Sequence, residues 1–147
     1  MNELNMKKDD GAGATASSTA DHFIIKDGIE YSGTHLIIDL WGVYRLDDAQ
    51  YIEKVLTQCV EACGANLLHL HVHQFSSSGG ISGVAVLAES HISVHTWPER
   101  NYAAFDVFMC GDAKPLKAVD VLSKAFNPQQ LKVNEILRGH QDDESVC

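Results

Sequence analysis

Short runs in which apolar and polar side chains alternate constrain the fold of this chain more than any other feature. Residues 68–73 alternate strictly between Leu or Val and His, which is the period-two pattern of a strand with one buried face. Similar runs predict five more strands, so one sheet is expected at the centre of a single domain in this chain of 147 residues. These five runs span residues 35–40, 82–88, 91–96, 102–108 and 132–137.

One amphipathic segment predicts a helix over residues 48–63. Asp47 is expected to be its N-cap, Gln50 stands at the capping-box position, and Gly64 provides the C-terminal stop.

A second helix is predicted over about residues 115–126. Pro115 suits the first helical position, and Asn127-Pro128 ends the pattern. The simplest architecture that buries both helices is an α+β fold, an antiparallel sheet with the two helices on one face.

The same alternation places histidines on the other face of the sheet. If Leu68, Leu70 and Val72 face the helices, the histidines between them point away, because side chains alternate along a strand. A face this polar is expected to line a cavity or an interface with another subunit. A zinc site is an alternative, but no matched Asp or Cys ligand accompanies these side chains, and no metal is expected. The histidines in question are His69, His71, His73 and His91, with His95 on the same face of its run as His91.

Composition excludes several classes of protein. The formal charge is −9, from 20 acidic and 11 basic residues, which argues against a nucleic-acid-binding surface. No apolar run approaches the roughly 18 residues of a membrane span, and the N-terminus lacks the apolar segment of a secretory signal. The four cysteines include no CxxC pair, so we expect neither a zinc ribbon nor a disulfide framework, and a cytoplasmic location.

The two ends of the chain differ from its middle. Residues 1–27 are rich in Gly, Ala, Ser and Asp, and such a segment has too few large apolar side chains to offset the entropy of ordering it. We therefore expect a disordered N-terminal tail over residues 1–27, a domain over residues 28–140 and a C-terminal tail over residues 141–147.

Reactive side chains are concentrated in residues 89–99, with the sequence ESHISVHTWPE. A serine with nearby histidines suggests a hydrolase, but no G-x-S-x-G elbow surrounds Ser90. On spacing alone, a serine between two strand-like runs is more typical of a turn than of a nucleophile.

This run, followed by YAAFDVFMC up to Cys110, resembles the prokaryotic S-adenosylmethionine decarboxylases, which are small pyruvoyl-dependent enzymes. The resemblance covers about residues 31–139, and it includes GTHLIIDLWG, CVEACGA, Ser82-Gly83 and Arg138-Gly139. It implies a homodimer in which two sheets face each other in an αββα sandwich.

The resemblance also implies that the chain cleaves itself. The hydroxyl of Ser90 attacks the carbonyl of Glu89, the amide becomes an ester, and elimination separates residues 1–89 from residues 90–147. Ser90 becomes a pyruvoyl group, which forms a Schiff base with the substrate amine and accepts the electrons released with carbon dioxide.

Three residues match the family's processing and catalytic positions. His95 matches the histidine that acts as acid or base in processing, and Ser82 matches the serine that supports the processing intermediate. Cys110 matches the residue that returns a proton to the substrate after carbon dioxide leaves.

Three more residues match positions that bind S-adenosylmethionine. Trp97 and Glu99 match the positions for adenine stacking and ribose recognition, and Phe75 matches an aromatic residue supplied by the neighbouring subunit. The loop over residues 75–82 is one residue longer than the family's pattern. This difference leaves open a pyruvoyl-dependent decarboxylase of arginine or ornithine, and a non-catalytic dimeric binding module is the third alternative.

Overall fold

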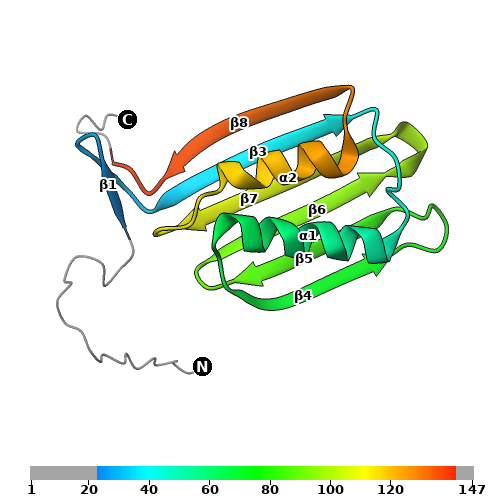
Figure 1. Ribbon diagram of the computed structural model, residues 1–147, viewed down its shortest axis with the longest axis horizontal. Coiled ribbons are helices and arrows are strands. Elements are labelled where there is room, and N and C mark those ends of the chain that lie inside the picture. Colours follow the sequence, from blue (N-terminus) through cyan, green and yellow to red (C-terminus); the bar gives the residue numbers. More distant parts are fainter. Residues whose placement is uncertain (1–22, 142–147) are drawn as a thin grey trace.

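The computed structural model describes residues 23–141, which form a six-stranded antiparallel sheet with two helices on one face (Figure 1). The expected α+β architecture is confirmed. The helices are α1 (Ala49–Cys63) and α2 (Leu116–Phe126). In spatial order the strands are β4 (Leu67–Gln74), β5 (Ile81–Leu87), β6 (Ser90–Trp97), β7 (Tyr102–Cys110), β3 (Gly33–Trp41) and β8 (Gln130–Arg138).

A small hairpin precedes this sheet and corrects the predicted tail. Strands β1 (Ile24–Lys26) and β2 (Ile29–Tyr31) pair across a two-residue turn. Both turn residues have positive φ, 55° at Asp27 and 80° at Gly28, and Asp-Gly is a preferred sequence for such a turn. The prediction of a tail up to residue 27 is therefore wrong at its end, whereas residues 1–22 and 142–147 lie outside the described residues.

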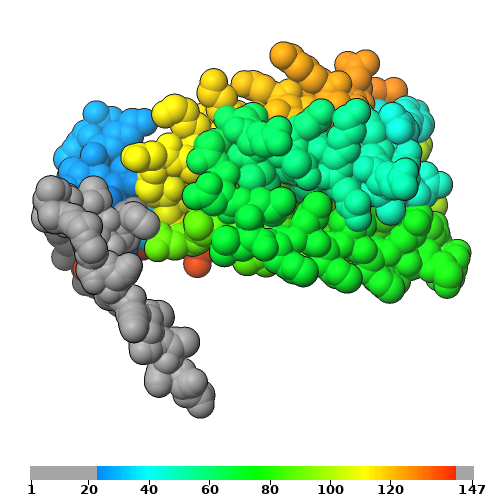
Figure 2. Space-filling model, turned by 60° about the horizontal axis from the view of Figure 1, so that its bottom comes forward, coloured from blue at the N-terminus to red at the C-terminus, as the bar shows by residue number. Residues whose placement is uncertain are grey.

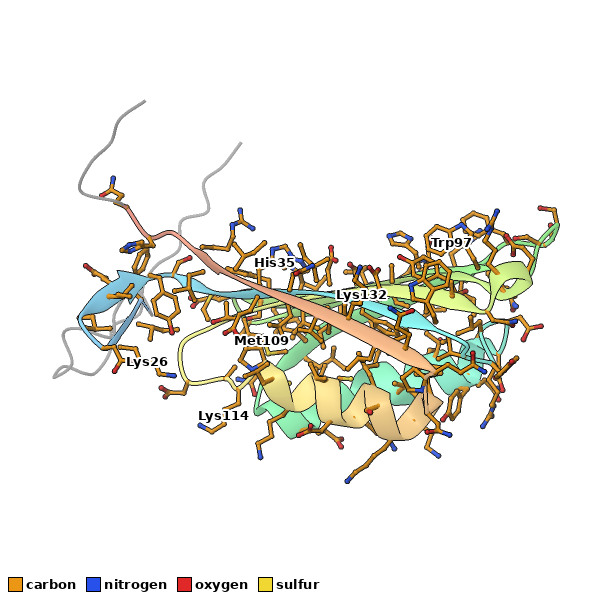
Figure 3. The ribbon with its side chains drawn as sticks, turned by 90° about the horizontal axis from the view of Figure 1, so that it is seen from above. Lys26, His35, Trp97, Met109, Lys114 and Lys132 are labelled. Atoms are coloured by element: carbon orange, nitrogen blue, oxygen red, sulfur yellow. The ribbon has the colours of Figure 1, made fainter. Side chains whose placement is uncertain are left out.

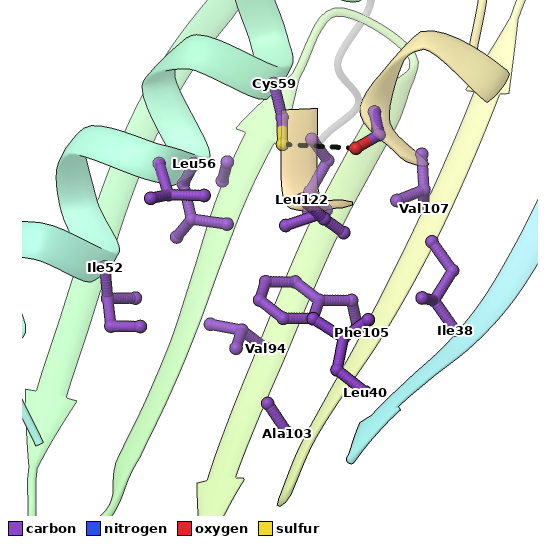
Figure 4. Packing of buried hydrophobic residues seen from close by; sticks show 14 of the residues in the cluster. Ile38, Leu40, Ile52, Leu56, Cys59, Val94, Ala103, Phe105, Val107 and Leu122 are labelled. Carbon is purple, nitrogen blue, oxygen red and sulfur yellow. Dashed lines mark hydrogen bonds between the residues drawn. The ribbon is translucent and has the colours of Figure 1, made fainter. Parts of the chain in front are cut away.

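The core lies between the sheet and the helices (Figure 4). Phe105 of β7 sits at its centre, and alternate residues of the four inner strands, β5, β6, β7 and β3, point toward α1 and α2. The two helix cysteines, Cys59 and Cys63, are buried here and point at carbonyls of the segment that opens α2. Burial raises the pKa of Cys59 to about 12 and that of Cys63 to about 11, so both are packing residues.

The start of α1 differs from the prediction by one residue. The N-cap is Asp48, whose Oδ1 accepts a hydrogen bond from the Tyr51 N–H at 3.1 Å, and Arg45 holds its other oxygen at 2.9 Å. Asp47 therefore does not cap the helix, and Gln50 does not occupy the capping-box position. The Arg45 guanidinium and the Tyr51 N–H lower the pKa of the Asp48 carboxyl.

The C-terminal ends of both helices follow the expected chemistry, whereas the start of α2 differs from the prediction by one residue. Gly64 ends α1 in the left-handed region with φ of 75°, as predicted, and Asn127 ends α2 in the same region. Pro115 takes the capping position of α2, so the helix begins one residue later, at Leu116.

The face of the sheet opposite the helices has no covering layer within residues 23–141, and we call it the open face. Figure 3 shows His35 and Trp97 on this side and Met109 on the helix side. Leu68 departs from the predicted pattern, because an irregularity between Leu67 and His69 leaves it 66% exposed instead of facing the helices. Leu70 and Val72 do pack against the core.

No helix within residues 23–141 is long and apolar enough to cross a membrane.

Replacing Leu122 with Ala tests the packing of α2 on the sheet. Leu122 is fully buried, whereas Leu116 of the same helix is 54% exposed. Removing a buried leucine side chain costs about 2–5 kcal/mol, so Leu122→Ala should lower the free energy of unfolding in urea by that amount. Leu116→Ala is the matched control and should change it little; equal losses in the two variants would contradict the described packing.

Candidate functional site

The Glu89-Ser90 peptide lies at a tight turn between the neighbouring strands β5 and β6. Leu87 of β5 pairs with Ser90 of β6, which leaves Ala88 and Glu89 as the turn. Glu89 has a φ of 58°, in the left-handed region that favours glycine. Backbone strain of this kind is common at functional sites. Here it lies beside the Glu89-Ser90 bond, which the resemblance implies is cleaved.

Cys110, at the end of β7, makes two hydrogen bonds to this turn. Its thiol donates to the carbonyl oxygen of Glu89 at 3.0 Å, and its backbone N–H donates to Ser90 Oγ at 3.2 Å. The carbonyl carbon that Ser90 would attack is therefore polarised by a side chain 21 residues away in sequence.

The environment keeps the Cys110 thiol protonated. Burial raises its pKa above the ordinary value of a cysteine, the Glu89 carboxylate raises it further, and the hydrogen bond with Ser90 opposes them. A neutral thiol in this place can donate a hydrogen bond or a proton, as the resemblance requires.

This turn lines one side of a cavity of about 490 Å³. It is bounded by the C-terminal end of α1, the loop after β7 and the start of β1. We call it the turn cavity, and its lining includes Ile24, Asn66, Glu89, Ser90, Cys110 and Asp112.

Ser82 and His95 lie at the other end of the sheet. They face each other across β5 and β6, and Ser82 Oγ lies 2.9 Å from His95 Nδ1. Beside them is a second cavity of about 220 Å³, which Phe75, Trp97 and Glu99 help to line. Glu99 comes from η2 (Pro98–Arg100), the short helical turn after β6. The structure therefore brings five of the predicted residues together.

The two groups are too far apart to act on one another within a chain. Ser90 and His95 are five residues apart on the same strand, which corresponds to about 17 Å at roughly 3.3 Å per residue. Ser82 is equally remote, because it pairs with His95. One chain thus holds Glu89, Ser90 and Cys110 at one end, and Ser82 and His95 at the other.

The loop between β4 and β5 forms a closed structure in spite of its predicted extra residue. The Phe75 N–H donates to the Gly80 carbonyl, and the Gly79 N–H donates to the Phe75 carbonyl, both at 2.8 Å. Phe75 also packs edge-on against His73 at 4.6 Å between ring centroids. Its side chain is held beside the second cavity.

An aromatic stack beside Trp97 was missed by sequence reasoning. Tyr102 stacks between Trp41 at 4.3 Å and Trp97 at 5.1 Å. Its hydroxyl donates to Asp39 at 2.6 Å, and burial together with Asp39 raises its pKa to about 12. The period-two pattern of β3 and β7 places these residues on the open face, but their pairing depends on strand register.

Histidines also gather on the open face near the Cys110 end. His35 and His91 lie 6.2 Å apart between ring centroids, and Asp106 lies 4.0 Å from His35. Burial, His35 and Arg138 lower the pKa of His91, against the opposing effect of Asp106.

The zinc alternative finds no support in side-chain placement. His69 and His71 stack with their ring centroids 6.5 Å apart, whereas His91 belongs to the other cluster. Within residues 23–141, no group of three or more His, Cys, Asp or Glu side chains is placed to hold a metal ion.

Comparison with known proteins gives a consistent result. A family model described as S-adenosylmethionine decarboxylase matches residues 34–139. An S-adenosylmethionine decarboxylase proenzyme of Methanococcus maripaludis is 49% identical over 117 residues, covering 78% of this chain and 95% of that protein. One from Thermomicrobium roseum is 44% identical over 108 residues, covering 73% and 93%. A crystal structure of the adenosylmethionine decarboxylase from Aquifex aeolicus superposes with a TM-score of 0.66 at 32% identity, covering 80% of this chain and 98% of that one.

The relatives and the solved structure are matched over nearly their whole length, and the family-model match includes the turn, the Cys110 strand and the Ser82–His95 pair. The chain therefore belongs to the S-adenosylmethionine decarboxylase family.

Proposed function

We propose that this chain is a self-cleaving S-adenosylmethionine decarboxylase that depends on a pyruvoyl group derived from Ser90. The observation that carries the proposal is the Cys110 thiol, which donates to the carbonyl of Glu89 in a turn where Glu89 is held at positive φ. The relatives' names identify them as decarboxylase proenzymes, which supports cleavage here and favours S-adenosylmethionine over arginine or ornithine. The same names disfavour a non-catalytic binding module.

Cleavage begins with attack of Ser90 Oγ on the carbonyl carbon of Glu89. Negative charge develops on the Glu89 oxygen, and the thiol hydrogen bond from Cys110 stabilises it. The C–N bond then breaks to give an ester and a free amine. Removal of the Ser90 α-proton then breaks the bond between Oγ and the β-carbon of Ser90. Glu89 leaves with a new main-chain carboxylate, and the two chains are separated.

The pyruvoyl group supplies an electron-withdrawing carbonyl that accepts the electrons left when a carboxylate is lost as carbon dioxide. In this proposal Cys110 returns the proton, and the support is that its thiol and backbone N–H lie beside Glu89 and Ser90.

The remaining residues reach the turn in a homodimer. Packing two open faces about a twofold axis that runs across the strands would put the Ser90 end of β6 opposite the other end of the partner's β6. A rotation of this kind keeps each strand opposite its own copy, so Ser82 and His95 of the partner subunit, on β5 and β6, would then lie over the Ser90 end of those two strands. The open face also exposes apolar side chains that such packing would cover, namely Ile37, Trp41, Val86, Trp97 and Ile136.

The substrate's adenosine would bind at the second cavity. One face of Trp97 is occupied by Tyr102, and its 39% exposed remainder can stack on a purine. Glu99 can accept hydrogen bonds from the ribose hydroxyls, and Phe75 adds an apolar wall. We further propose a cytoplasmic location, since the cysteines at positions 59, 63 and 110 are all free.

Intact mass and carbon dioxide release test the proposal together. The purified protein should consist of residues 1–89 and a pyruvoyl-capped chain of residues 90–147, and it should release carbon dioxide from S-adenosylmethionine but not from arginine or ornithine. Ser90→Ala should remain a single inactive chain, because it lacks the attacking hydroxyl. A full-length species in the unchanged protein, or activity only on arginine, would refute the proposal.

Co-expression of two variants that are each defective in cleavage tests the shared site. His95→Ala alone should cleave slowly, and Ser90→Ala cannot cleave. In a mixed dimer, the His95→Ala chain supplies an intact Ser90 and the Ser90→Ala chain supplies an intact His95. The His95→Ala chain should therefore be cleaved. Co-expression with the double variant Ser90→Ala/His95→Ala is the control and should give no rescue. Failure of Ser90→Ala to restore cleavage would mean that the site lies within one chain.

Variants of Cys110 should separate its two contributions. Cys110→Ala should slow cleavage without abolishing it and reduce kcat of the processed enzyme by about 10²-fold or more, the usual worth of a general acid. Cys110→Ser should cleave better than the Ala variant, since a hydroxyl can still donate to Glu89, yet remain poor in turnover. Because the thiol acts when protonated and its pKa is raised in the uncut chain, its contribution to cleavage should be lost only at a pH above the ordinary range of a cysteine. Equal losses of cleavage and turnover would contradict these roles.

A further inference from the structure

We propose that the β1–β2 hairpin is a wall of the turn cavity that shields the Ser90 ester from water, so that the ester eliminates instead of hydrolysing. This inference rests on the proposed self-cleavage and assigns a role to a segment outside the region that the family model matches, residues 34–139.

The placement of β1 is the first observation. Phe23, Ile24 and Ile25 line the same cavity as Glu89 and Ser90. Figure 2 shows the hairpin, in blue, against the yellow segment that follows β7. Apolar side chains thus form one side of a cavity whose other sides are largely backbone turns and polar residues.

The hairpin is fixed to the body of the fold at its second strand. The N–H and hydroxyl of Ser32, just after β2, both donate to the carbonyl of Arg138, at 2.7 and 2.8 Å. His140 Nδ1 lies 3.2 Å from the carbonyl oxygen of Glu30, and Tyr31 is buried. With β2 held in this way, strand pairing holds β1 over the turn cavity.

Water matters because the ester has two fates. Elimination removes the α-proton of Ser90, breaks the Oγ–Cβ bond and releases Glu89 with a main-chain carboxylate. The enamine that remains at position 90 then takes up water and loses ammonia to give the pyruvoyl group. Hydrolysis instead adds water at the ester carbonyl, and it leaves the Glu89 carboxylate and an unmodified serine at the start of the second chain. The second outcome yields a cleaved but inactive protein.

Matched serine substitutions in the hairpin test the proposal. Ile24→Ser places a hydroxyl at the cavity wall, whereas Ile29→Ser makes the same change at a hairpin residue that does not line the cavity. The full chain is expressed, and the chain of residues 90–147 is analysed by intact mass. The serine-start and pyruvoyl forms differ by the mass of one ammonia.

Ile24→Ser should raise the serine-start fraction several-fold and lower carbon dioxide release in proportion, while Ile29→Ser should match the unchanged protein. Ile24→Ala is a milder change and should give an intermediate serine-start fraction. It provides a second test if Ile24→Ser does not fold. Equal fractions in Ile24→Ser and Ile29→Ser, whether raised or not, would overturn the inference. An unchanged protein that does not cleave at all would instead remove the proposed function.

Discussion

The rise of a β-strand determines how the chemistry of this protein is arranged. Ser90 and His95 belong to one strand, and an extended backbone places five residues across about 17 Å. A strand cannot fold back to bring its ends together, so the serine and the histidine can cooperate only across two sheets. The shared site that we propose is a consequence of that geometry. His35 Nε2 fits this view, because it is buried without a hydrogen-bond partner among the described residues, on the surface where a second sheet would lie.

Much of the fold follows from the sequence because its period-two and helical patterns are local. The six strands of the main sheet and both helices lie close to where alternation and end signals place them. The misses have local causes. Asp48 caps α1 in place of Asp47 because Arg45 and Tyr51 converge on it. The predicted boundary between tail and domain falls within the Asp27-Gly28 turn of the hairpin, although this dipeptide between two apolar runs is a signal for a hairpin.

The candidate site was less accessible from sequence. The residues themselves were identified through the family's motif, but motif order says nothing about which end of a sheet each one occupies. The contact between Cys110 and Glu89 depends on the register of β7 against β6, and the stack of Trp41, Tyr102 and Trp97 depends on β3 as well. Such relations are non-local, and they emerge only when the strands are paired.

The strand order also decides what would become of the molecule after the turn is cut. Strand β3 belongs to residues 1–89, yet it lies between β7 and β8, which belong to residues 90–147. Strands β5 and β6 stay paired on either side of the cut, and α1 packs against α2 from the other fragment. Each fragment is thus interleaved with the other through three strand interfaces and a helix pair. Separating them would break three of the five strand pairings in the main sheet, so a cut at the turn would create new chain ends while the two fragments stay associated.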